Sequence, residues 1–136
     1  MQYVLTFGHA GTQAGEFQRA SGSLWLDHKL YVADAINNRI LVFDTNTGKH
    51  IGTLRHPHLD IPYDIAFDKK NRHLYIAEYG AGRVTEMDLS GTIIATFGHT
   101  GRDRDELMTP WGLALTPDRK LRIMDTGNRR IMELEL

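Results

Sequence analysis

The sequence contains no cysteine, which excludes disulfide bridges, thiolate zinc sites and cysteine nucleophiles. It also lacks an excess of charge of either sign, because 16 Lys and Arg residues stand against 17 Asp and Glu residues, for a net charge of -1. The chain as a whole therefore has no electrostatic attraction for phosphate backbones or anionic lipid. Neither a nucleic acid nor a membrane is an expected partner.

Long apolar runs are missing as well. No run approaches the length that spans a membrane, and the first eight residues lack a basic segment followed by an apolar one. These absences predict a soluble protein and leave its compartment open. With 136 residues, 41% of them hydrophobic, the chain is long enough to bury one sizeable core.

The dominant feature of the sequence is a repeat. The stretch from Leu30 to Asp44 consists of a strand-like run that ends on an acid, four residues of turn chemistry, and an arginine that opens a second alternating run. The same plan recurs twice, and the acids fall at Asp34, Glu78 and Asp125. The spacing between these acids is the repeat length, and it is typical of propeller blades and helical arrays. Apolar residues at every second position, bounded by Gly and Asn turns, favour strands over helices.

The repeat divides the single domain into three units and one extra strand. The units cover residues 21–54, 62–97 and 110–136, and the third lacks its outer strand. The extra strand, residues 3–7, matches residues 93–97, because both are followed by Gly-His-x-Gly. Residues 3–7 therefore correspond to the outer strand of a blade. In total the sequence predicts three blades of four antiparallel strands, with the closing strand moved to the N-terminus.

The repeat resembles the NHL repeat. The likeness lies in Pro62 to Asp68, in Pro110 to Thr116, in the Leu-Tyr-Val-Ala-Asp stretch at residues 30–34, and in the Gly-Glu-Phe loop at residues 15–17. In the first unit, Ser21 stands at the expected proline and Ser23 at the expected glycine. The resemblance implies an all-β, six-bladed β-propeller whose ring is closed by a strand from the other end of the chain.

Three blades are half of such a ring, and propellers have about four to eight blades. Three blades alone would expose two apolar faces and unpaired strand edges. We therefore expect a homodimer, in which residues 3–7 of each copy pair with residues 129–135 of the other by strand exchange. The alternative is that the chain is half of a longer propeller, natural or designed, and that its partner is a different chain.

Three acid–arginine pairs recur at one spacing: Asp34 with Arg39, Glu78 with Arg83, and Asp125 with Arg130. An acid and an arginine on neighbouring strands form a charge-assisted pair. A catalytic carboxylate needs one special environment, whereas this arrangement occurs three times. We expect all three pairs to be structural.

Candidate binding residues lie where the repeats differ. Aligned on the innermost strand, Gly22, Tyr63 and Trp111 share one position, and Ser23, Asp64 and Gly112 share the next. The resemblance places this position near the mouth of the central channel. Tyr63, Asp64 and Trp111, with Tyr79 and the charged cluster at residues 102–106, would offer a loop-rich face for a protein, peptide or small ligand. The alternative is that the aromatic side chains fill the channel as packing.

Signals for catalysis are weak. His56 and His58 are possible metal ligands, but zinc usually has three or four ligands, and no further one is evident. The sequence has no phosphate-binding glycine loop or His-Glu-x-x-His motif, so no cofactor is expected. We therefore expect a non-enzymatic binding or scaffold module. The alternative is a metal-dependent lyase similar to the peptidyl-hydroxyglycine amidating lyases, whose zinc histidines follow the blade prolines; Gly22, Tyr63 and Trp111 stand at these positions.

Overall fold

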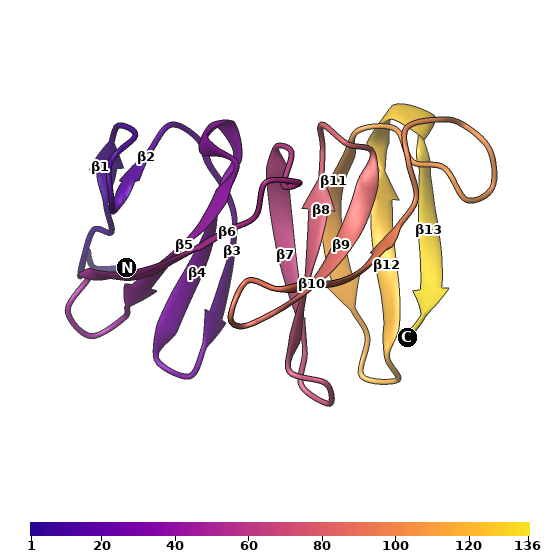
Figure 1. Cartoon of the computed structure of the whole chain (residues 1–136). Coiled ribbons are helices and arrows are strands. Elements are labelled where there is room, and N and C mark those ends of the chain that lie inside the picture. The colour runs from indigo at the N-terminus through magenta and orange to yellow at the C-terminus, as the bar shows by residue number, and fades with distance from the viewer.

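The computed structural model describes residues 1–136, which form β-strands, two single-turn 3-10 helices and loops. Three large sheets, called blade one, blade two and blade three, follow one another along the chain (Figure 1). Blade one contains β3 (Ala20–Leu26), β4 (Lys29–Asp34), β5 (Arg39–Asp44) and β6 (His50–Arg55). Blade two contains β7 (Pro62–Asp68), β8 (His73–Glu78), β9 (Arg83–Asp88) and β10 (Ile93–Phe97). Blade three contains β11 (Pro110–Leu115), β12 (Lys120–Asp125) and β13 (Arg130–Glu135).

Within each blade the strands are antiparallel, and strands that are consecutive in sequence lie next to each other. The predicted all-β fold of four-stranded antiparallel blades is confirmed. A short parallel ladder joins β1 (His9–Ala10) to β2 (Glu16–Phe17) in the loop before blade one. The 3-10 helices η1 (Ala35–Asn37) and η2 (Thr126–Asn128) are turns within blades one and three. The structure offers no helix of the length and hydrophobicity that crossing a bilayer requires.

Neighbouring blades are held together by their apolar faces. Alternate residues of a strand face opposite sides of the sheet, so that Tyr31 and Ala33 of β4 point toward blade two while Val32 points away. A core of ten buried residues lies between blades one and two, and a core of six between blades two and three. Burial of apolar surface between sheets is thus the main force that sets the relative position of the blades.

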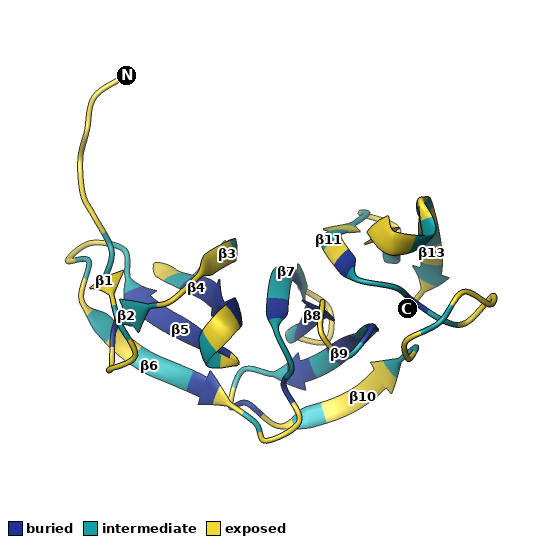
Figure 2. Ribbon diagram, turned by 90° about the horizontal axis from the view of Figure 1, so that it is seen from above, coloured by how far each residue is buried: buried dark blue, intermediate teal, exposed yellow.

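The blades stand side by side along an arc (Figure 2). The innermost strands β3, β7 and β11 line its concave side, while β6 and β10 run along its convex side. β7 contacts both β3 and β11, which keeps the concave side closed between the blades. One face of blade one and one face of blade three lie at the ends of the arc and have no neighbouring blade.

Residues 1–7 form no strand within the chain, although residues 3–7 are predicted to be one. The segment extends away from blade one in Figure 2, and Tyr3 and Val4 are 78% and 85% exposed. Its end lies against blade one: the Phe7 ring packs edge-on against Phe43 at 6.0 Å between centroids, and Leu5 and Thr6 lie beside Gly48. The segment thus has no strand partner in its own chain, and its pairing with another copy remains a prediction.

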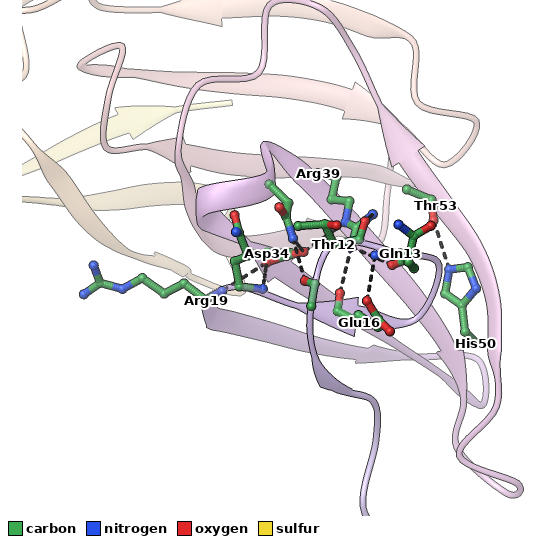
Figure 3. Close-up of polar contacts among 12 residues, drawn as sticks. Thr12, Gln13, Glu16, Arg19, Asp34, Arg39, His50 and Thr53 are labelled. Atoms are coloured by element: carbon green, nitrogen blue, oxygen red, sulfur yellow. Dashed lines mark hydrogen bonds and ion pairs between the residues drawn. The ribbon is translucent and has the colours of Figure 1, made fainter.

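The Asp34–Arg39 pair lies at the centre of a polar network in blade one (Figure 3). Arg39 Nε donates to Asp34 Oδ2 at 2.9 Å, and the two side chains are 1% and 0% exposed. The other guanidinium nitrogens donate to the backbone carbonyls of Thr12, Gln13 and Glu16. This pair therefore fixes the loop before blade one as well as two strands of the blade.

The same arrangement recurs in the other blades. Arg83 Nε donates to Glu78 at 2.9 Å and Arg130 Nε donates to Asp125 at 2.7 Å. Arg83 also donates to the His58 carbonyl, and Arg130 donates to the carbonyls of residues 103 and 106. In each blade the arginine therefore holds the loop that leads into that blade.

Ion pairs also join neighbouring blades at the hairpin ends. Arg119 Nη2 of blade three donates to Asp68 Oδ2 of blade two at 2.7 Å, and the Asp68 side chain is 3% exposed. Burial raises the pKa of Asp68, but hydrogen bonds from Arg119 and from Lys70 N–H outweigh it and lower the pKa below its ordinary value. Arg72 pairs with Asp27 in the same way between blades two and one, but both side chains there are largely exposed.

We expect Asp68→Asn to destabilise the protein by about 1.5–3 kcal/mol at neutral pH, as for a hydrogen bond to a charged group. Because the folded-state pKa of Asp68 is lowered, this stabilisation is present above the ordinary aspartate pKa of about 3.9 and is lost as the pH falls through the folded-state value. Urea unfolding at several pH values measures it. The matched control Asp27→Asn should cost about 0–1 kcal/mol. Equal losses for the two variants at neutral pH would contradict this assignment.

Candidate functional site

The strand registers correct the predicted alignment of the innermost strands. Pro62 lies opposite Glu78 and Pro110 lies opposite Asp125, while the residue opposite Asp34 is Ala20. Ala20 therefore occupies the position of the blade proline, and the prediction that Ser21 does so is wrong by one residue. Without a proline the sequence offers no fixed point there. The turn between β3 and β4, residues 27–28, is also shorter than the turn between β7 and β8, residues 69–72, so counting back from the turn gives the wrong residue.

The position after the proline is accordingly shared by Ser21, Tyr63 and Trp111, and Gly22 aligns instead with Asp64 and Gly112. Gly22 has a structural reason to be glycine, since a Cβ on it would lie 2.5 Å from Asp64 Cα. Strands β3 and β7 thus approach closely on the concave side of the arc. None of the three residues that follow the proline position is a histidine.

Three of the predicted binding residues come together in space. The rings of Tyr63 and Tyr79 stack with centroids 5.5 Å apart and an interplanar angle of 33°. Trp111 meets Tyr63 edge-on at 5.4 Å. Tyr79 and Trp111 remain 37% and 49% exposed. We call Tyr63, Tyr79 and Trp111 the aromatic cluster; it combines residues of blades two and three.

Arg19 completes this group from the loop that leads into blade one. Its Nη2 donates to the Tyr63 hydroxyl at 2.9 Å, and its guanidinium carbon lies 5.4 Å from the centre of the Tyr63 ring. Arg19 forms no ion pair with any acid of the chain. In Figure 3 its side chain points away from the network around Asp34, although its own backbone N–H donates to Asp34 at 3.1 Å. The remaining guanidinium donors are available to an anionic group.

Sequence reasoning did not find Arg19. It follows the Gly-Glu-Phe element of the loop before β3 but is not part of it, and it is 44 residues from Tyr63. The one available signal was its place immediately before an innermost strand, where the other units have Ile61 and Thr109. A charged residue at that position distinguishes the first unit from the other two.

Asp64, the fourth predicted binding residue, takes part in interblade hydrogen bonding. Its Oδ2 accepts from the backbone N–H of Leu113 in β11 at 2.9 Å, and its Oδ1 accepts from Ile65 N–H at 2.9 Å. Both oxygens of the carboxylate are thus held by backbone donors of blades two and three. The structure thus uses Asp64 to join the innermost strands of blades two and three.

The two histidines named as weak metal candidates lie next to each other. The rings of His56 and His58 are 5.2 Å apart, and His56 Nδ1 accepts from His58 N–H at 3.2 Å. No group of three or more His, Asp or Glu side chains lies close enough together to hold a metal ion. The geometry therefore brings no third ligand to this pair.

The charged residues at 102–106 are partly committed to the structure of their loop. Glu106 accepts from the backbone N–H groups of Asp103 and Arg102, at 2.8 and 2.7 Å, and pairs with His99 at 3.1 Å. These bonds, led by the one from Asp103, hold the pKa of Glu106 below its ordinary value. Glu16 and His9 form the equivalent pair before blade one. Glu106 is thus a loop-forming residue.

Comparison with solved structures identifies the architecture. The chain is similar to the virginiamycin B lyase of Staphylococcus aureus (18% identity, TM-score 0.60), over 86% of this chain and 41% of the lyase. It is similar to a streptogramin B lyase (15%, 0.66) over 96% of this chain and 43% of that one. It also matches the Myxococcus xanthus glutaminyl cyclase (14%, 0.67) over 97% and 58% of the two chains. The fold is that of a β-propeller.

These similarities show the propeller fold but no family, activity or ligand, because the sequence identities are below one fifth. The chain spans about half the length of the propellers it matches. No protein-family model matches the sequence, and the comparison with curated proteins found no match.

Proposed function

We propose that the chain is a non-enzymatic binding module, an NHL-type half propeller that self-associates into a six-bladed ring and binds a protein, peptide or small ligand on its loop-rich face. The observation that carries the binding proposal is the aromatic cluster with Arg19 beside it. Three blades each contribute to this group, so the packing of the blades holds it in place before any ligand arrives. Arg19, Tyr63 and Trp111 are of the residue types that dominate binding energy at interfaces.

The chemistry of the group favours a peptide segment that carries an aromatic or apolar side chain next to an acid. The exposed ring faces of Tyr79 and Trp111 would contact the apolar part. The free donors of Arg19 would bind the carboxylate, since guanidinium and carboxylate form strong paired hydrogen bonds. The balanced net charge makes a local contact of this kind more selective than a general electrostatic one.

Self-association is supported by the ends of the arc. On the free face of blade three, Ile131 is 70% exposed and Met124 is 54% exposed. On the free face of blade one, the buried residues Val32, Leu41 and Phe43 are covered by side chains of the chain's own N-terminal segment and loop, Phe7 and Phe17 among them. A second copy related by two-fold symmetry would bring these two faces together twice.

A lyase is the second candidate, because two of the similar structures are a virginiamycin B lyase and a streptogramin B lyase. In the amidating lyases that the sequence resembles, histidines after the blade prolines bind zinc. Ser21, Tyr63 and Trp111 stand at these positions, and His56 and His58 are the two imidazoles that lie next to each other. Metal analysis of untagged protein separates the candidates: one zinc per chain that is lost in His56→Ala would favour the lyase.

Selection of peptides from a random heptapeptide library on phage tests the binding proposal. We expect peptides enriched in an aromatic residue near an acid, and we expect Trp111→Ala to weaken their binding at least about tenfold, as for a buried interface anchor. The control is Ile94→Ala, since Ile94 is 50% exposed and lies in β10 on the convex side of the arc, away from the cluster (Figure 2). Selected peptides that bind both variants equally would contradict the proposed site.

A further inference from the structure

The N-terminal segment and loop repeat a later part of the chain in sequence and in hydrogen bonding. Residues 3–20 align with residues 93–110 at a constant offset and without a gap. In the first loop Gly11 N–H donates to the Phe17 carbonyl at 2.9 Å, and in the second Gly101 N–H donates to the Leu107 carbonyl at 3.1 Å. Residues 8–19 therefore already have the conformation of the loop that follows an outer strand.

The difference lies in the strand itself. Residues 93–97 form β10, which pairs with β9 and completes blade two. Residues 3–7 are the counterpart of β10 and pair with no strand, while β13, the counterpart of β9, has a free outer edge. Beside that edge lies a groove of about 670 Å³, whose walls include Phe97, Met132 and Leu134. The two unsatisfied elements lie at opposite ends of the arc (Figure 2), so one chain cannot join its own.

We infer that residues 3–7 of a second copy fill this edge in the register that β10 uses on β9. In blade two, Ile93 lies opposite Met87, Thr96 opposite Thr85, and Phe97 opposite Val84. Transferred by the repeat, Tyr3 lies opposite Leu134 of the second copy, Thr6 opposite Met132, and Phe7 opposite Ile131. This inference rests on the proposed self-association and adds which residues of the two copies lie opposite each other.

We call the proposed contact of residues 3–19 of the second copy with blade three the closing joint. It differs at Arg129 from the equivalent contact within the chain, which residues 93–109 make with blade two. Its counterpart in blade two is Gly82, which has φ 61 and lies under the loop that follows β10. A Cβ on Gly82 would lie 2.7 Å from the Leu107 carbonyl oxygen and 2.8 Å from Thr100 Cα, both of them backbone atoms. Arg129 has the same left-handed conformation, with φ 56, but carries a Cβ and a long side chain. The loop of the second copy therefore cannot seat as deeply as its counterpart does.

Two further differences weaken the closing joint. Arg122, paired with Glu133 at 2.9 Å on the free face of blade three, takes the place of the buried Tyr75 in blade two. Thr116 takes the place of Asp68, so the ion pair that joins blades two and three has no counterpart at the closing joint. In the proposed ring the two closing joints are therefore weaker than the contacts between blades within each chain. The Arg129 side chain keeps the two copies from packing as closely as blades two and three do.

Engineered disulfides test the register, and the absence of cysteine makes the background clean. The double variant Thr6→Cys with Met132→Cys should give a disulfide-linked dimer under mild oxidation, because directly opposed residues meet the distance that a disulfide needs. The matched control, Val4→Cys with Met132→Cys, is displaced along the strand and should link poorly. Equal linking of the two variants, or stronger linking of the control, would overturn the register.

Arg129→Gly tests the closure, with Arg129→Ala as the control that keeps the Cβ. Sedimentation equilibrium should show that the glycine variant dimerises about tenfold more tightly than the alanine variant, the size expected for relief of one overpacked contact. A ratio near one would overturn the role of Arg129. If no variant, including the parent chain, forms a dimer, the proposed self-association itself fails. A dimer with the wrong crosslinks contradicts only the register.

Discussion

Replacing Arg39 with methionine is expected to lower the free energy of unfolding by about 3–5 kcal/mol, the cost of removing one partner of a buried ion pair. Arg39 and Asp34 are 1% and 0% exposed, so the variant would leave the Asp34 carboxylate without its charged partner and away from water. It would also release the carbonyls of Thr12, Gln13 and Glu16. Chemical denaturation followed by circular dichroism measures the change.

The repeat supplies a matched control for this prediction. Arg130 makes the equivalent contacts in blade three, but its side chain is 32% exposed, so water can reach the groups that its removal leaves. Arg130→Met should therefore cost clearly less than Arg39→Met. Replacing both members of the buried pair, as in Asp34→Leu with Arg39→Met, should also cost less than Arg39→Met alone. If the two single variants lost equal stability, burial would not be what makes the Asp34–Arg39 pair important.

Deletion of residues 1–6 is expected to convert the dimer into a monomer at micromolar concentration. The deletion removes most of the strand proposed to fill the edge of β13 but keeps Phe7, which packs against Phe43 within the chain. Loss of several backbone hydrogen bonds at about 1 kcal/mol each corresponds to a weakening of roughly 1,000-fold. Light scattering and sedimentation velocity give the mass directly.

The control for the deletion is a variant that lacks only residues 1 and 2. It keeps Tyr3 to Phe7 and should remain a dimer. Circular dichroism of the longer deletion should still show a folded β-sheet protein, because residues 1–6 form no strand within one chain. A dimer of unchanged affinity after the longer deletion would show that the edge of β13 is not the point of contact.

Much of the fold could be predicted because it depends on local sequence. Period-two alternation and the acid that ends each second strand placed Leu30 to Asp44 and its two copies correctly as strands and turns. The spacing of each acid and its arginine likewise predicted pairs that the structure forms on adjacent strands. Hairpin partners are close in sequence, so their contacts follow from turn length and pattern.

The candidate site was only partly predictable. Tyr63 and Trp111 were identified because their position differs between repeats, Tyr79 was named as part of the same face, and the structure brings the three together. Asp64 was named with them but bonds to the backbone of β11. Arg19 was not identified, because its contact with Tyr63 crosses from one blade to the next. Contacts between blades depend on how the sheets stack, which no local pattern encodes.

The sequence by itself determined that the chain is a series of strand repeats, with an N-terminal segment that duplicates a later outer strand and a last unit that lacks one. These features follow from local periodicity and from the repeat. Only the tertiary structure decided the register of β3, the grouping of Arg19 with the aromatic cluster, and the position of the free N-terminal segment opposite the free edge of β13. The physical reason is that the last two depend on the packing of apolar faces between blades, which involves residues far apart in the chain. The register of β3 had to come from its pairing with β4, because no proline marks its start.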